Sequence, residues 1–97
     1  MSVGVTALPE TLTLGEASAS LAALRQAFLA DADPVWRIDA APLRQLDSSA
    51  IAVLLECRRM AAAARREVQI VGAPPRLMEL AHLYGVDQLI SGVRSPT

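Results

Sequence analysis

Short strand-like segments alternate with longer helix-like segments along this chain, and that alternation limits its fold more than any other feature. Apolar residues alternate with small or polar ones at residues 3–7 and 11–14, which is the period of a β-strand. Two further strand-like runs, Val35–Asp39 and residues 68–71, stand next to helical segments. Strands separated by helices predict an α/β fold in which helices cover a small, mixed, partly parallel sheet.

The first half of the chain predicts two paired strands and one helix. We expect residues 3–7 and 11–14 to form a hairpin across Pro9. A helix then begins at Glu16 and ends before Pro34. Its inward residues, at helical spacing, are Ala17, Leu21, Leu24 and Phe28. Residues 40–46 have no strong period and predict a connecting loop.

The second half predicts two more helices. One begins at Asp47 or Ser48 and runs to about Arg66. The last opens at Pro74-Pro75 and closes at Gly85, because proline suits a first helical turn and glycine the residue after a last one. Its inward stripe is predicted to be Leu77, Leu80, Ala81 and Tyr84.

Length and composition predict one modest domain spanning residues 1–97, with a frayed tail from Ser91. The chain is 53% hydrophobic but only 3% aromatic, so its core must be built mainly from aliphatic side chains. A net charge of −1 supplies no positive field for nucleic acid. No apolar run approaches the roughly 20 residues that span a bilayer, and the lone Cys57 predicts core packing in a reducing cytosol.

The helix after Asp47 carries an unusual outer side. One stripe is apolar and predicts the core face: Ala50, Val53, Leu54, Cys57, Met60, Ala61 and Ala64. The far side mixes aliphatic residues with cations, namely Ile51, Leu55, Arg58, Arg59, Ala62 and Arg65. Because arginine is enriched at interfaces, we interpret this side as a docking surface. The alternative is that Ile51 and Leu55 pack under a neighbouring segment and the arginines only solubilise the helix.

The start of that helix allows two roles for Asp47, Ser48 and Ser49. Asp and Ser are common N-cap residues, which accept hydrogen bonds from the free amides of a first turn. A hydroxyl there is also a favourable place for a phosphate, because helix amides and dipole favour negative charge. The two roles are compatible. Ser48 shares the predicted docking side with Ile51, Leu55 and Arg59, which follow it at spacings of three to four residues.

Catalysis and cofactor binding are not predicted. The sequence has no glycine-rich phosphate loop of the nucleotide-binding types. His82 is the only histidine, with no Cys or carboxylate at metal-ligand spacing, and predicts a surface residue. Ser48, Cys57 and His82 fall on different faces and form no nucleophile and base. We therefore expect no enzyme activity, no cofactor and no metal.

Several of these segments resemble the STAS domain family, named for sulfate transporters and anti-sigma factor antagonists. The similar segments are Ile38-Asp39, Leu46-Asp47-Ser48-Ser49-Ala50, the following Ile51-Ala52-Val53-Leu54-Leu55, the strand Val68–Gly72 and Leu80–Val86. Within the family, the chain is most similar to the small STAS subunit of the Mla-type phospholipid-transport ABC system. The resemblance implies a STAS-like fold, places Ser48 at the functional hydroxyl position and turns the start of its helix toward a partner.

The resemblance leaves three hypotheses about function. In the first, the chain is a cytoplasmic accessory subunit, peripheral to the inner membrane through its partner, that binds an ABC ATPase using residues 47–49, Ile51, Leu55, Arg58 and Arg59. In the second, it is an anti-sigma factor antagonist that a partner kinase phosphorylates at Ser48. Phosphorylated members usually carry Gly at the position of Ala50, and alanine favours a continuous helix instead. The third is a module that senses a small or lipidic ligand.

Overall fold

The structure is a computed structural model that describes residues 5–88. Within these residues the elements follow one another as β1 (Val5–Ala7), β2 (Thr11–Leu12), α1 (Leu14–Ala30), β3 (Val35–Asp39), β4 (Gln45–Leu46), α2 (Ser48–Ala63), β5 (Glu67–Val71) and α3 (Pro75–Leu83). The tail predicted from Ser91 lies outside the described residues.

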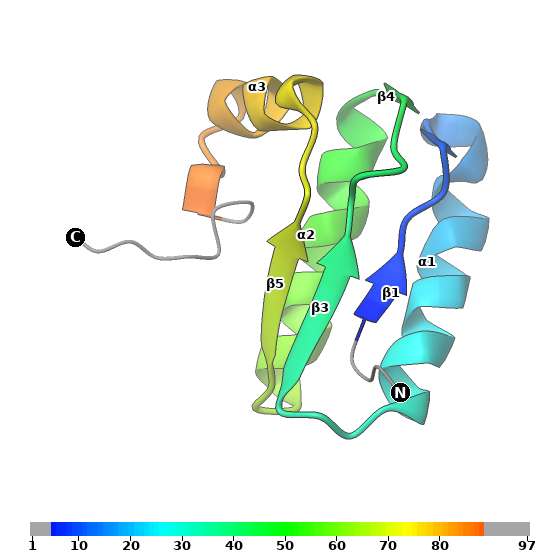
Figure 1. Cartoon of the computed structure of the whole chain (residues 1–97), viewed down its shortest axis with the longest axis vertical. Helices are drawn as coiled ribbons and strands as arrows, with labels where there is room; N and C mark the ends of the chain where they lie inside the picture. Colours follow the sequence, from blue (N-terminus) through cyan, green and yellow to red (C-terminus); the bar gives the residue numbers. More distant parts are fainter. Residues whose placement is uncertain (1–4, 89–97) are drawn as a thin grey trace.

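The main sheet has three strands in the order β1-β3-β5, and both of its pairings are parallel. Ile38 at its centre is in register with Thr6 on one side and Ile70 on the other. Helices α1 and α2 lie side by side on one face of this sheet, and α3 lies across the end where its strands finish (Figure 1). The predicted α/β class is confirmed.

The predicted hairpin is wrong, because β1 and β2 pair with different strands. After β1 the Leu8 amide donates to the Asp39 carbonyl oxygen, 2.9 Å away, and so continues along β3. β2 then forms a second parallel pair with β4, in which Leu12 is in register with Leu46. Both leucines are buried, and their burial stabilises the pairing. β4 therefore forms a short strand within residues 40–46, which were expected to be a loop.

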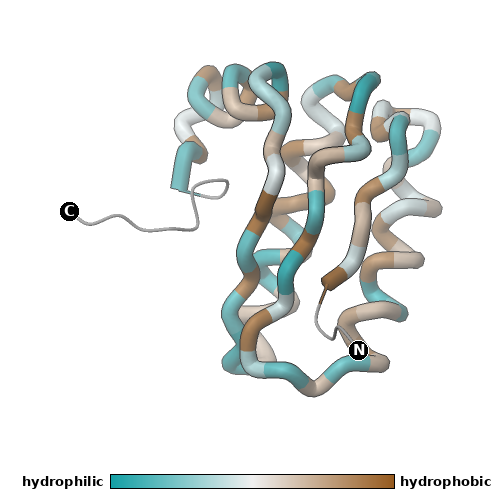
Figure 2. Tube along the Cα trace, in the orientation of Figure 1, coloured by the Kyte–Doolittle hydropathy of each residue, from teal (hydrophilic) through white to brown (hydrophobic). Residues whose placement is uncertain are grey.

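Trp36 stands at the centre of the core, which fills the space between the sheet and the two long helices. Figure 2 shows hydrophobic and hydrophilic residues mixed along β3 and β5, and along β3 the buried Trp36 and Ile38 alternate with partly exposed residues, as expected for a strand covered on one face. Trp36 and Ile38 are wholly buried. The Trp36 indole nitrogen donates to the Thr6 hydroxyl at 3.1 Å, and its ring packs against Phe28 with centroids 4.9 Å apart. Two of the three aromatic residues thus meet beneath the central strand.

Helix α1 begins two residues earlier than its apolar spacing predicts. Thr13 is the N-cap, and the Glu16 carboxylate accepts hydrogen bonds from both the Thr13 hydroxyl (2.6 Å) and the Thr13 amide (3.0 Å). These bonds lower the pKa of Glu16. Leu24 and Phe28 are buried as predicted. The two hydrogen bonds from Thr13 to the Glu16 carboxylate therefore fix the helix start two residues before Glu16.

Helix α2 ends at Ala63, three residues before the predicted end, in a left-handed turn. Arg65 has a φ of 60°, and the Arg66 amide donates to the Ala61 carbonyl at 2.8 Å. This is a Schellman motif, which closes a helix by satisfying its last carbonyls. Ala64, predicted to face the core, is exposed because it already stands at the C-cap of the helix.

The Arg66 side chain ties the end of α1 to the start of β5. Its Nη1 donates to the Phe28 carbonyl oxygen at 2.8 Å, and its Nε donates to the Asp33 carbonyl oxygen at 2.7 Å. The guanidinium carbon also lies 4.3 Å from the centroid of the Phe28 ring. A single arginine thus joins segments more than thirty residues apart.

Helix α3 follows the prediction except at Tyr84. Leu77 and Ala81 are buried, and Leu80 packs partly against the core. Tyr84 is 52% exposed, so its predicted inward position is wrong. The helix ends at Leu83 and Gly85 takes a φ of 72°, which turns the chain before Tyr84 can complete the stripe.

Candidate functional site

Asp47 joins the starts of α1 and α2. Its Oδ1 accepts a hydrogen bond from the Ser49 amide at 2.8 Å, which confirms the predicted N-cap. Its Oδ2 accepts from the Leu14 amide at 3.3 Å, in the first turn of the other helix. The bond from Ser49, followed by that from Leu14, lowers the pKa of Asp47. One carboxylate therefore serves two helix starts, where free amides favour negative charge.

Ser48 is the first residue of α2, and its side chain is exposed. The cap comes from Asp47, so α2 does not depend on Ser48 for its start. Ser49 beside it is only partly exposed. Of the three polar residues predicted at this end, Ser48 is thus the hydroxyl most open to a partner.

A continuous strip of exposed or half-exposed residues runs down α2 from Ser48. We call it the outer stripe, and its members are Ser48, Ala52, Leu55, Arg59 and Ala62, spaced by three or four residues and therefore aligned on one side of the helix. Leu55 is partly buried and packs against the core, whereas Arg59 is exposed. Arg58 is also exposed and lies beside the stripe. The structure thus brings Ser48, Leu55 and Arg59 into one row.

Ile51 does not belong to this exposed side. The sequence placed it there, but its side chain is only 4% exposed, and it belongs to the same core cluster as Leu77 and Ala81 of α3. Ile51 therefore faces the core and not the solvent. The alternative considered for Ile51, packing under a neighbouring segment, is the one that the structure shows.

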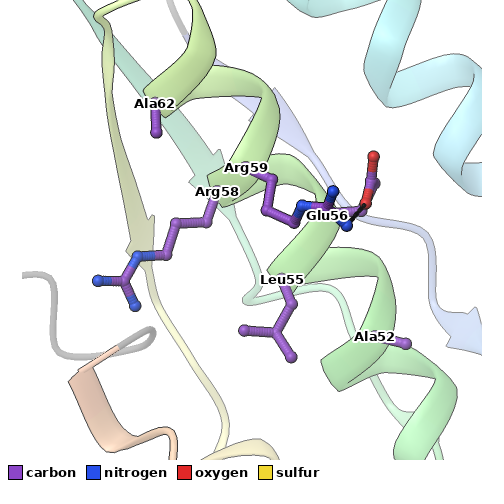
Figure 3. A pocket seen from close by; sticks show the side chains of 6 residues that line it. All are labelled: Ala52, Leu55, Glu56, Arg58, Arg59 and Ala62. Carbon is purple, nitrogen blue, oxygen red and sulfur yellow. Dashed lines mark hydrogen bonds and ion pairs between the residues drawn. The ribbon is translucent and has the colours of Figure 1, made fainter.

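A shallow groove of about 490 Å³ follows the outer stripe from Ala52 to Ala62. Its lining residues are Ala52, Leu55, Glu56, Arg58, Arg59 and Ala62 (Figure 3). We call it the α2 groove. Arg58 and Arg59 extend to opposite sides of Leu55 in this view, and Arg59 turns toward Glu56, with 3.3 Å between its Nη1 and the Glu56 Oε1.

Two lining residues of the α2 groove were missed by sequence reasoning. Ala52 was not assigned to either side of the helix, although it stands four residues after Ser48 and three before Leu55. Glu56 was also not assigned, yet it is three residues before Arg59 and forms an ion pair with it. Helical spacing from Ser48 and from Arg59 would have identified both.

The nucleophile and ligand candidates do not come together. Cys57 is buried in the core, and burial raises the pKa of its thiol to about 12, so the thiol stays protonated at neutral pH. His82 is exposed as predicted, and its Nδ1 lies 2.9 Å from the Asp87 carboxylate, which lowers the pKa of Asp87. Residues 5–88 contain no group of three or more side chains placed to hold a metal ion.

The fold and this helix surface define a small α/β domain with a parallel sheet covered on one face and a polar helix start open to a partner. Residues 5–91 match the family model described as "Mlab, STAS domain". The chain therefore belongs to the STAS domain family, whose members are small regulatory or accessory domains that generally mediate protein–protein interactions.

The search of curated proteins finds no match for this chain. In the part of the chain that the structure describes, no helix is both long enough and apolar enough to cross a membrane.

Proposed function

We propose that the chain is a non-enzymatic accessory protein that binds and regulates the ATPase subunit of an Mla-type phospholipid-transport ABC complex, on the cytoplasmic side of the membrane. The observation that carries the proposal is the outer stripe, an exposed row that begins with a hydroxyl at a helix start and continues through an aliphatic and a cationic side chain. The match to a family model described as "Mlab, STAS domain" supports the choice of partner.

The proposed mechanism is binding without chemistry. The ATPase partner would supply nucleotide hydrolysis, since the chain has no phosphate-binding loop and its only thiol is buried. Regulation follows if the outer stripe binds one conformation of the ATPase more tightly than another, because differential affinity shifts that equilibrium.

Charge and bulk on the outer stripe test this proposal. The chain is co-expressed with the ATPase subunit of an Mla-type complex, and the amount recovered on the tagged chain is measured for Ser48→Glu, Ala52→Arg and Leu55→Arg. All three should abolish capture. Ala52→Arg is the cleanest of them because Ala52 is exposed, whereas Leu55 also packs against the core.

Gln26→Arg, at an exposed position on α1, is the matched control and should bind as the unchanged chain does. Circular dichroism of each variant shows whether it is folded. Normal capture by folded Ser48→Glu and Ala52→Arg would show that the outer stripe is not the interface.

The second candidate is a phosphorylation-controlled anti-sigma factor antagonist, favoured by the exposed Ser48 hydroxyl at the first residue of α2. A phosphate there would lie near free helix amides. Incubation with an anti-sigma factor kinase and ATP, followed by intact-mass measurement, should then add one phosphate to the chain and none to Ser48→Ala. An unchanged mass would exclude this function with that kinase.

A further inference from the structure

The α2 groove has an apolar floor with little side-chain bulk. Leu55 forms its centre and is held from below by the core. Ala52 and Ala62 stand on either side of Leu55 along the helix, each exposing only a methyl group. Ala62 follows Ala52 by ten positions, which is about 15 Å along the helix, so a partner backbone can approach α2 closely over two to three turns.

Cations border this floor. Arg58 and Arg59 are both exposed, and Glu56 is the one acid among the six lining residues, so the groove carries a formal charge of +1 although the whole chain carries −1. Among residues 5–88, Glu56 pairs with Arg59 and no ion pair engages Arg58. Arg58 is therefore available to a carboxylate from outside.

A carboxylate from a partner can also replace Glu56 in its ion pair with Arg59. The Arg59 side chain is 80% exposed, and surface pairs of this kind contribute little because water and salt screen them. Arginine binds carboxylates through a planar fork of donors, so Arg58 and Arg59 can both donate hydrogen bonds to acidic side chains of a partner.

We infer that the α2 groove receives an amphipathic helix of the partner, whose apolar stripe lies over Leu55 and whose Asp or Glu residues pair with Arg58 and Arg59. This inference rests on the proposed function and names the partner segment. A helix placed in a groove matches an apolar floor of this length bordered by charge. An anionic membrane surface matches it less well, because the apolar part holds a single large side chain, Leu55.

Two designed peptides test the inference. Each has about 18 residues, enough for a stable helix, and a leucine stripe at i, i+4 and i+7. One carries Glu on both borders of the stripe and the other carries Lys. Fluorescence anisotropy of each labelled peptide is measured against the full chain at about 50 and about 300 mM salt.

The Glu-bordered peptide should bind, and its affinity should fall at least about tenfold at high salt or with Arg58→Glu. Arg44→Glu, which makes the same charge change at an exposed site before β4, should leave the affinity within about twofold. The inference is overturned if the Lys-bordered peptide binds equally, if the Glu-bordered peptide fails to bind at about 1 mM, or if only anionic phospholipid vesicles respond to Arg58→Glu.

Capture of the ATPase subunit separates this inference from the proposed function. If unchanged chain and folded Arg58→Glu capture the ATPase equally, the acidic-helix inference fails and the proposed function stands. If the Glu-bordered peptide binds through Arg58 but no ATPase is captured, the proposed partner is wrong and the inferred segment chemistry holds.

Discussion

Arg66→Met should destabilise the domain by about 3 kcal/mol. The substitution keeps an apolar stem but removes the two hydrogen bonds that the guanidinium donates to the carbonyl oxygens of Phe28 and Asp33. Each bond to a charged group contributes about 1.5–3 kcal/mol. We use the lower value because both bonds are only partly buried, so water can replace part of what is lost. The ion pair with Asp31 adds little, since its atoms are 3.9 Å apart.

Urea unfolding followed by Trp36 fluorescence measures this loss, because Trp36 is the only tryptophan and is wholly buried. For a domain of this size, 3 kcal/mol corresponds to a fall in Tm of about 12–24 °C. Arg66→Lys should recover less than half of the loss, since one ammonium cannot reproduce the fork. The exposed Arg58→Met is the control and should change stability by less than about 0.5 kcal/mol. A loss below about 1 kcal/mol for Arg66→Met would refute the view that this side chain ties α1 to β5.

Three further changes test other parts of the fold. Arg65→Gly should stabilise the domain by about 0.5–1 kcal/mol in urea unfolding, because glycine adopts the φ of 60° without the strain that a side chain carries; a loss of stability would show that the turn is not strained. Gly72→Ala should cost at least about 2 kcal/mol in the same assay, because φ is 68° and the added Cβ would lie 3.0 Å from Asp39 Oδ1 and 3.1 Å from Ala41 Cβ; a neutral result would refute the close packing. The Asp47 pKa is lowered from 3.8 on folding, so its stabilising charge acts above that value and is lost as pH falls through the folded pKa; the stability difference between the unchanged chain and Asp47→Asn should shrink from about pH 6 to about pH 2, and a constant difference would contradict this.

The sequence predicted the features that depend on local signals. β3 matches the strand expected at residues 35–39, and α2 begins after the predicted cap at Asp47. Both are encoded by neighbouring residues, either as alternation within a strand or as a carboxylate before a helix. The left-handed Gly85 likewise marks the end of α3.

The features that the sequence did not predict depend on distant residues. β2 pairs with β4 across more than thirty residues, and no local pattern distinguishes that parallel pair from a hairpin. Arg66 contacts the end of α1, which its own surroundings do not indicate. Ile51 is buried in the core cluster, and a helical wheel of α2 alone does not show which segments pack against that helix.

The same distinction applies to the candidate site. Spacing along one helix was enough to place Ser48, Leu55 and Arg59 in a row. It could not show that Leu55 is supported by the core, nor that Glu56 already engages Arg59. Those contacts depend on the tertiary packing and on the side-chain conformations.

The bridge that Asp47 makes between two helix starts bears on the speed of recognition. One carboxylate binds both the Ser49 and Leu14 amides. The backbone around Ser48 is therefore fixed to the first turns of both α1 and α2. A partner that meets this region loses little conformational freedom of the domain on binding. Association there should therefore proceed as a rigid-body encounter, with a rate set by diffusion and orientation and no slow rearrangement of this chain.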